Sequence, residues 1–356
     1  MKDIKKINTV ILGYGFSGSI FFAPFLHLHE GFTLKGAWER SEKKIQKDYS
    51  YVNSYESLAE ILADESIDLV VVNTPIDTHY TYAKEVLKAG KHVIVEKAFT
   101  NTAAEAKELC ELAKNMDLHL IVYQNRRFDS DFLTAKKILK SGKLGPLKEV
   151  NIAYDIHHPQ LREGGEAHTE KPVSGGEFNN RGSHITDQAL NLFGLPTAVF
   201  ADFATFRKGG TVEDYVNAIL FYPDKRVKLH ETNIAVRRQD AYVFHGLEGS
   251  FFKSRSDMQE DLLLTGAKPS KGPWCAEPEN EEGHLYYFSN GERIKETIPT
   301  EIGNYYNYFE AVYRALVYGE PVPVTGWEGY HTMLVMDAVR KSVNTGSIVE
   351  IDLTGY

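Results

Sequence analysis

Glu96 and Lys97 stand directly after the apolar run Val93–Val95, where a lysine could serve as a base. A ligand bound at the end of such a strand would partly desolvate the Lys97 ammonium group and lower its pKa toward a range useful for proton transfer. The alternative is a surface pair of opposite charges, which is the commoner role of such neighbours. On these residues alone the surface pair is favoured, so a catalytic Lys97 depends on the other motifs.

His184 lies at the start of a predicted helix, Ser183–Phe193, and an imidazole can exchange a proton near neutral pH. Asn180 precedes it by one turn and Asp187 follows it by about one turn, so either side chain could orient the ring. A histidine at a helix start is often a cap or a core residue. The preceding Gly175-Gly176 pair would let the backbone approach a ligand closely, which makes a catalytic role equally reasonable.

A Gly-x-Gly-x-x-Gly turn follows the apolar run Ile7–Leu12 and precedes a helical pattern. This order is what a dinucleotide site requires, since the glycines allow a tight turn, a close approach to a pyrophosphate and the packing of helix on strand. The helix start adds N–H groups and the positive end of its dipole. The candidate phosphate-binding residues are Gly13, Gly15, Phe16, Ser17 and Gly18.

Glu39 ends a second strand-like run, Thr33–Trp38, about 20 residues after Gly18, where the adenosine ribose would be held. Its charge favours NAD by repelling a 2′-phosphate, whereas Arg40 and the serine after it could accept one. We therefore expect a site for NAD or NADP, with NAD favoured.

Polar residues also follow two later strand-like runs. Ligands of an open parallel sheet bind at the carboxyl ends of its strands, so Asn73 and Thr74 are candidates for the nicotinamide end. Pro75 is a further candidate at the cofactor site, unless it simply starts the next loop. Asn125 and Arg126 follow the last such run. Arg126 and Arg127 could contact substrate, cofactor phosphates or carboxylates, and we expect a carboxylate contact for one of them.

The composition limits the class of protein. A formal net charge of −9 argues against a nucleic-acid partner, and 42% hydrophobic with 25% charged residues is typical of a soluble globular protein. Two cysteines form neither a disulfide framework nor a metal cluster, and Cys110 is expected to be a buried hydrophobic residue. The basic and apolar N-terminus imitates a signal peptide, but its glycine spacing and Pro24 argue against one. We expect a cytoplasmic protein with no membrane anchor and no metal.

The 356 residues are long for one core, so we expect two domains, 1–125 and 126–356. Apolar runs alternate with helical patterns in the first, which predicts an α/β Rossmann domain with a parallel sheet. Successive strands predict, for the second, an α+β domain with a large, predominantly antiparallel open sheet. The predicted helices are 77–89, 102–116, 131–140, 183–193, 304–318 and 328–343. Hairpin turns are expected at 223–225 and 289–292, a polar loop at 157–176 and a surface excursion at 254–282.

Taken together, these motifs resemble the glucose–fructose oxidoreductase / inositol dehydrogenase family (Gfo/Idh/MocA) over most of the chain. The resemblance rests on the glycine fingerprint, the Thr-Pro…His…Ala-Gly-Lys-His-Val…Glu-Lys run from Thr74 to Lys97, Asn-Arg-Arg-Phe from Asn125, and Gly-Ser-His-Ile-Thr-Asp-Gln-Ala-Leu from Gly182 to Leu190. The nearest branch contains NADP-dependent scyllo-inositol dehydrogenases.

The resemblance implies reversible oxidation of a sugar or polyol hydroxyl, with Lys97 or His184 taking the proton. It places His79, Glu96 and Lys97 in the run at the cofactor site, although the setting of His79 alone suggests a structural or solvated residue. It also implies dimers or tetramers formed through the open sheet face. Two residues depart from the family pattern: Ala98 replaces a proline after the lysine, and Asn180 replaces an aspartate.

Asparagine can hydrogen-bond an imidazole but supplies no charge to stabilise an imidazolium ion. Three hypotheses therefore stay open. The first is an NAD(P)-dependent sugar or cyclitol dehydrogenase. The second is a glycosidase that uses bound NAD for transient oxidation, and the third is a catalytically weak ligand sensor.

Overall fold

Residues 4–39, 42–161, 175–278 and 280–352 are described by the computed structural model, and the chain forms two units. The first unit comprises Met1–Phe128, Met258–Cys275 and Asn304–Tyr330. The second comprises Asp129–Asp257, Ala276–Gly303 and His331–Tyr356. Each unit is thus assembled from separate stretches of sequence. The division of the chain into domains 1–125 and 126–356 stays a prediction.

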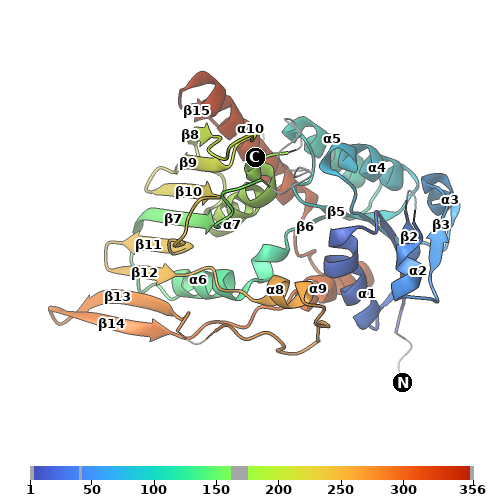
Figure 1. Cartoon of the computed structure of the whole chain (residues 1–356), viewed down its shortest axis with the longest axis horizontal. Coiled ribbons are helices and arrows are strands. Elements are labelled where there is room, and N and C mark those ends of the chain that lie inside the picture. Colours follow the sequence, from blue (N-terminus) through green and yellow to red (C-terminus); the bar gives the residue numbers. More distant parts are fainter. Residues whose placement is uncertain (1–3, 40–41, 162–174, 279, 353–356) are drawn as a thin grey trace. The chain divides into compact units, whose positions relative to one another are not determined.

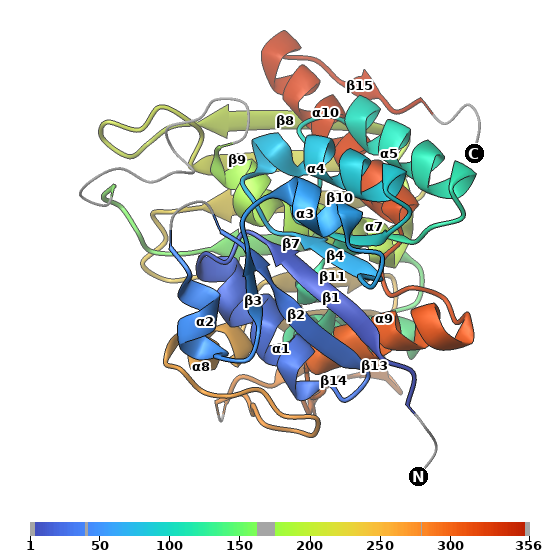
Figure 2. The same ribbon diagram turned by 90° about the vertical axis from the view of Figure 1, so that its right-hand side faces the viewer.

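The first unit contains a six-stranded parallel sheet of order β3-β2-β1-β4-β5-β6, part of which Figure 2 shows face-on. Its strands are β1 (Ile7–Leu12), β2 (Phe32–Trp38), β3 (Asn53–Tyr55), β4 (Leu69–Val72), β5 (His92–Glu96) and β6 (Leu120–Tyr123). The predicted Rossmann sheet is confirmed. The strand order reverses between β1 and β4, and ligands of such sheets bind at this switch point.

Helices cover both faces of this sheet, with α4 and α5 on one side and α1 and α9 on the other (Figure 1). The helices of the unit are α1 (Ala23–Leu28), α2 (Lys44–Asp48), α3 (Leu58–Ala63), α4 (Ile76–Lys88), α5 (Ala103–Asn115), α8 (Gln259–Leu264) and α9 (Tyr306–Tyr318). The predicted cap of α5 is confirmed, because the Thr102 hydroxyl accepts from Glu105 N at 3.2 Å. The Glu105 carboxylate accepts from Asn101 N, one residue earlier than a capping box requires.

Aromatic packing explains why α9 belongs to the first unit. Phe309 stacks on Phe25 of α1 with ring centroids 5.3 Å apart. Tyr308 is buried and its hydroxyl donates to Val122 O of β6 at 3.1 Å. The sheet therefore gains one of its covering helices from a segment that lies far later in the sequence.

The second unit contains a nine-stranded sheet of order β14-β13-β12-β11-β7-β10-β9-β8-β15. Its strands are β7 (Leu147–Asp155), β8 (Ala198–Ala204), β9 (Tyr215–Phe221), β10 (Arg226–Thr232), β11 (Tyr242–Gly246), β12 (Gly249–Lys253), β13 (Gly283–Ser289), β14 (Glu292–Ile298) and β15 (Val349–Glu350). All neighbours are antiparallel except β7 and β10. The predicted predominantly antiparallel sheet is confirmed, with one parallel pair.

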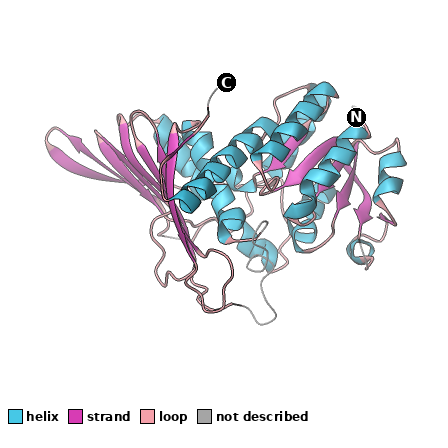
Figure 3. Cartoon of the chain, turned by 90° about the horizontal axis from the view of Figure 1, so that it is seen from above, coloured by secondary structure: helices cyan, strands magenta, loops and turns pink. Residues whose placement is uncertain are grey.

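Helices of the second unit gather on one face of this sheet, as the view from above shows (Figure 3). They are α6 (Ser130–Lys140), α7 (Ser183–Phe193) and the greater part of α10 (Gly326–Thr345). The β13–β14 hairpin turns at Asn290 and Gly291 with φ of 53° and 80°, as an Asn-Gly type I′ turn requires.

The predicted surface excursion at 254–282 is wrong in part. Ser256, Gln259, Leu263 and Cys275 are all buried, and the segment includes α8. Its polar composition is misleading because several polar groups are paired inside the protein. For example, Gln259 Oε1 accepts from Tyr305 N at 2.7 Å.

Candidate functional site

The glycine turn after β1 has the shape that a phosphate-binding loop needs. Gly13 has φ +88°, and a Cβ there would lie 2.5 Å from Asn73 O. A Cβ on Gly18 would lie 2.7 Å from Gly13 O, so the helix start packs tightly against the turn. At Gly15, by contrast, no described atom lies within 4 Å of the position that a Cβ would take, so the backbone faces open space. Of these three glycines, Gly15 is therefore the one that the packing of the described residues does not require. Its lack of a side chain leaves room for a ligand.

Ser17 and Phe16 complete this turn. The Ser17 hydroxyl is buried and, among the described residues, has no hydrogen-bond partner. Phe16 is 63% exposed, which is unusual for so large an apolar residue. The π-helical turn η1 (Gly18–Phe22) follows directly, and such turns are frequent at functional sites. A donor without a partner beside an open backbone fits a phosphate oxygen.

Glu39 lies at the end of β2 and caps the next helix. Its Oε1 accepts from Lys44 N at 2.9 Å and its Oε2 accepts from Ile45 N at 3.1 Å, at the start of α2. Each oxygen keeps a lone pair that can accept from a ribose hydroxyl. Arg40, the candidate for a 2′-phosphate, lies outside the described residues.

Thr74 and Pro75 follow β4, beside the glycine turn. Asn73 Nδ2 donates to Gly13 O at 2.9 Å, which ties this strand end to the turn. The Thr74 hydroxyl accepts from Thr78 Oγ1 at 2.7 Å, and Pro75 precedes α4 as its N-cap. The structure thus brings these candidates to the same sheet edge as Gly13.

His79 is fully buried on α4. Its Nε2 lies 2.7 Å from Thr74 O and its Nδ1 lies 3.1 Å from Phe99 O. Burial lowers the pKa of the imidazole to about 4, so the ring is neutral and donates to one of these carbonyls. Because His79 has no exposed surface, it can influence a cofactor only by holding the backbone at Thr74 and at Phe99.

Glu96 and Lys97 end β5, the strand next to β4. Both side chains are half-buried, whereas Ala98 and Phe99 behind them are buried. The Lys97–Ala98 peptide bond is cis, and Phe99 has φ +86°. Burial raises the pKa of Glu96 to about 7, against the opposing charge of Lys97. This carboxyl group therefore changes charge near neutral pH.

Asn125 and Arg126 lie in the 3₁₀ turn η2 (Asn125–Phe128). Arg126 forms an ion pair with Glu260 and its Nη1 donates to the Tyr305 hydroxyl at 3.3 Å. Arg127 Nη1 lies 2.5 Å from Glu328 Oε1. Both arginines, rather than the single one expected, contact carboxylates, and these carboxylates belong to the later segments of the first unit. A cofactor contact of Asn125 or Arg126 stays a prediction.

His184 and Asn180 belong to the second unit, where the π-helical turn η3 (Phe178–Gly182) leads into α7. His184 and Asp187 are buried in the first turns of α7. Asn180 Nδ2 donates to Glu177 Oε2 at 3.0 Å. The structure thus gathers the predicted residues in two groups, one at the carboxyl edge of the first sheet and one at the start of α7. Most of the predicted loop 157–176 lies outside the described residues.

Comparison with known proteins supports this arrangement. A family model described as the NAD-binding Rossmann fold of an oxidoreductase family (GFO_IDH_MocA) matches residues 7–124, and its C-terminal alpha/beta domain matches residues 136–351. The chain belongs to the Gfo/Idh/MocA family.

Two relatives and one solved structure illustrate the likeness. The scyllo-inositol 2-dehydrogenase (NADP(+)) IolW of Bacillus subtilis is 32% identical over 96% of each chain. The uncharacterised oxidoreductase YdgJ of Escherichia coli is 37% identical over 87% of this chain and 89% of its own. The structure of the oxidoreductase yvaA from Bacillus subtilis has a TM-score of 0.92 and 32% identity, and the match covers 99% of this chain and 100% of that one.

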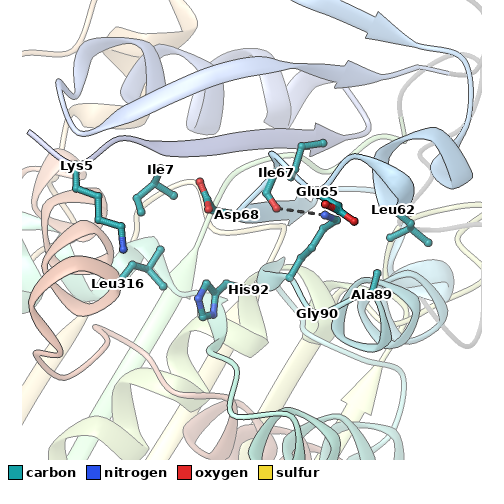
Figure 4. A pocket seen from close by; sticks show the side chains of 11 residues that line it. Lys5, Ile7, Leu62, Glu65, Ile67, Asp68, Ala89, Gly90, His92 and Leu316 are labelled. Carbon is teal, nitrogen blue, oxygen red and sulfur yellow. Dashed lines mark hydrogen bonds between the residues drawn. The ribbon is translucent and has the colours of Figure 1, made fainter.

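A separate pocket of about 320 Å³ lies at the opposite edge of the first sheet (Figure 4). Its lining includes Ile7, Ile67 and His92, which stand at or just before the amino ends of β1, β4 and β5. Lys91 points its ammonium group to Asp64 O and Ile67 O at 2.7 and 3.2 Å. Gfo/Idh/MocA proteins bind their nucleotide through an NAD-binding Rossmann fold. Such folds bind it at the carboxyl ends of the strands, so this pocket is not the cofactor site.

The sequence did not reveal Glu177, the residue that holds Asn180. An available signal was its spacing, three residues before Asn180 and four before Arg181, on one helical face.

In the described chain, no helix is long and apolar enough to cross a membrane, and no group of three metal-binding side chains comes together.

Proposed function

We propose that this protein is a dehydrogenase that uses NAD or NADP to oxidise, reversibly, a hydroxyl group of a sugar or an inositol-like cyclitol. The proposal rests on the glycine turn after β1, in a chain of an oxidoreductase family. There the Gly15 backbone is open, and the Ser17 hydroxyl next to it has no hydrogen-bond partner among the described residues. A relative that acts on scyllo-inositol supports the polyol class of substrate.

The residues of the turn fit a nicotinamide dinucleotide. Gly13, Gly15 and Ser17 would hold its pyrophosphate, Glu39 its ribose, and Thr74 would lie toward its nicotinamide end. The nicotinamide ring supplies the acceptor for hydride when the cofactor is bound. We propose NAD as the preferred form, because the Glu39 carboxylate repels a 2′-phosphate; the relative IolW uses NADP(+).

Lys97 and His184 would handle the proton of the hydroxyl group. In our proposal the Lys97 amine accepts it as the carbon–hydrogen bond breaks, and the His184 imidazole holds the hydroxyl through a hydrogen bond. Asn180 accepts a hydrogen bond from the imidazole or from the substrate. Because Asn180 is uncharged, Lys97 carries the larger share of the proton transfer.

The test is the absorbance of reduced nicotinamide with NAD and with NADP over a panel of inositols, aldoses and sugar acids. We expect turnover that falls at least 100-fold in Lys97→Ala and in His184→Ala. Cofactor binding without turnover across the panel would contradict the proposal. Reduced cofactor that forms and disappears on the enzyme would instead indicate a glycosidase, and ligand binding without any reduction would indicate a sensor.

We also propose a homodimer or homotetramer in the cytoplasm. Alternate residues of β9 are buried and half-buried, so one face of the second sheet remains partly open. Light scattering on the purified protein tests this state, and a monomeric mass at micromolar concentration would contradict it.

A further inference from the structure

Glu177 is a buried carboxylate that accepts from several donors at the start of η3. Its side chain is 4% exposed. Oε2 accepts from Asn180 Nδ2 at 3.0 Å and lies 3.0 Å from Arg181 Nη1. Oε1 accepts from Asn233 Nδ2 at 2.8 Å and lies 3.5 Å from Arg207 Nη2. These contacts hold the carboxylate in one orientation.

The charge of Glu177 determines which end of the Asn180 amide faces it. Burial opposes ionisation, but Arg181, Asn233, Asn180 and Arg207 outweigh it and hold the pKa of Glu177 below its usual range. An ionised carboxylate only accepts hydrogen bonds. The NH₂ end of Asn180 must therefore point to Glu177, and the carbonyl oxygen becomes the end that Asn180 presents elsewhere.

We propose that Glu177 is a positioning residue: it fixes Asn180 as a hydrogen-bond acceptor at the start of the helix that carries His184. This inference rests on the proposed dehydrogenase activity. The two side chains form a matched pair, in which the asparagine is needed because its partner is anionic.

The surroundings explain why an aspartate at position 180 would fit badly. Besides Arg181 and Arg207, the carboxyl groups of Glu213 and Glu231 lie within electrostatic range of Glu177. Burial and these like charges raise the pKa of Glu213 and Glu231 even with arginines close by. A further carboxylate about 3 Å from Glu177 would add a like charge to an already crowded buried cluster.

A double-mutant cycle tests the pair with Glu177→Gln, Asn180→Asp and the swap Glu177→Gln/Asn180→Asp. In the swap, the new amide donates to the new carboxylate and restores the pairing with its roles exchanged. We expect each single variant to lower kcat at least tenfold, and Asn180→Asp to add an ionisation between pH 5 and 8 to the kcat/KM profile. The swap should recover at least tenfold over Asn180→Asp and lose that ionisation. The inference would be overturned if the kcat losses of the two single variants simply multiplied in the swap and Asn180→Asp added no ionisation to the kcat/KM profile.

Asn191→Asp is the matched control, because Asn191 lies about two turns beyond His184 on α7 and its Oδ1 accepts from Lys136 Nζ at 2.8 Å. The same added charge there should leave kcat and the pH profile unchanged.

The urea midpoints of these proteins at pH 8 give a readout without substrate. Asn180→Asp should lower the midpoint and the swap should raise it again; additive shifts would contradict the pairing. If the wild-type protein turns over no polyol, the proposed function fails, and the midpoints still decide whether Glu177 and Asn180 form the pair.

Discussion

The side-chain amide of Asn73 donates to the carbonyl oxygen of Gly13 across 2.9 Å, and so joins the end of β4 to the turn after β1. The two segments flank the point where the strand order of the sheet reverses. The hydrogen bond therefore ties together the two segments between which a dinucleotide is expected to bind.

Asn73→Ala should weaken cofactor binding about tenfold, because the turn loses this tie. The lost hydrogen bond should also cost about 1 kcal/mol of stability. Asn8→Ala is the control, since Asn8 Nδ2 donates to Ser66 O at 2.7 Å at the other edge of the sheet. Calorimetric titration with NAD should show weaker binding for the first variant alone; equal affinities would argue against the role of Asn73.

Gly15→Ala should separate ligand binding from folding. A methyl group at Gly15 meets no described atom, so the thermal midpoint of unfolding should stay within about 2 °C of the wild type. The methyl group would, however, block the close approach of the pyrophosphate, so the affinity for the cofactor should fall at least tenfold. Gly13→Ala should instead lower the midpoint, because its φ is +88° and its Cβ would meet Asn73 O. Gly272→Ala, also in open space, should change neither quantity. Unchanged cofactor affinity in Gly15→Ala would show that the nucleotide does not approach this turn.

Glu39→Gln should raise the ratio of kcat/KM for NADP over NAD about tenfold, because a neutral amide no longer repels the 2′-phosphate. Part of the capping of α2 is lost at the same time. Ser57→Ala removes the comparable cap of α3, where the hydroxyl accepts from Glu60 N at 3.2 Å, and should leave the ratio unchanged. A ratio that does not move in Glu39→Gln would place the ribose away from this residue.

Glu96 should make stability depend on pH. Its pKa in the folded protein is raised to about 7 by burial, so between about pH 4.5 and 7 the folded state binds more protons than the unfolded state. The free energy of unfolding should therefore fall as pH rises through this window, by roughly 1–3 kcal/mol relative to Glu96→Gln. Urea denaturation from pH 4.5 to 8 measures the difference. The exposed Glu111→Gln is the control, and a difference for Glu96→Gln that stays constant with pH would refute the burial argument.

Local signals in the sequence identify the glycine turn after β1 and most helices correctly. The glycine spacing, the Thr102 cap and the Asn290-Gly291 turn each depend on residues close in sequence, and the structure confirms them. The parallel pairing of β7 with β10 depends on contacts between distant segments, as does the placement of α8 and α9 in the first unit.

The environment of Asn180 also could not be predicted from the sequence. Glu177 carries a charge, and charged residues are usually exposed. It is buried only because Arg207 and Asn233, which are remote in the chain, reach it. For the same reason the polar composition of 254–282 suggested a surface segment, although Gln259 pairs with backbone groups inside the protein.

The discontinuous first unit has a consequence for protein synthesis. The rings of Phe25 and Tyr123 are covered by α9, which leaves the ribosome only after the whole sheet of the second unit except β15 has been made. The six-stranded sheet therefore leaves the ribosome well before the helix α9 that covers one of its faces. During translation, the apolar side chains under α9 stay uncovered on that face until α9 itself has been made.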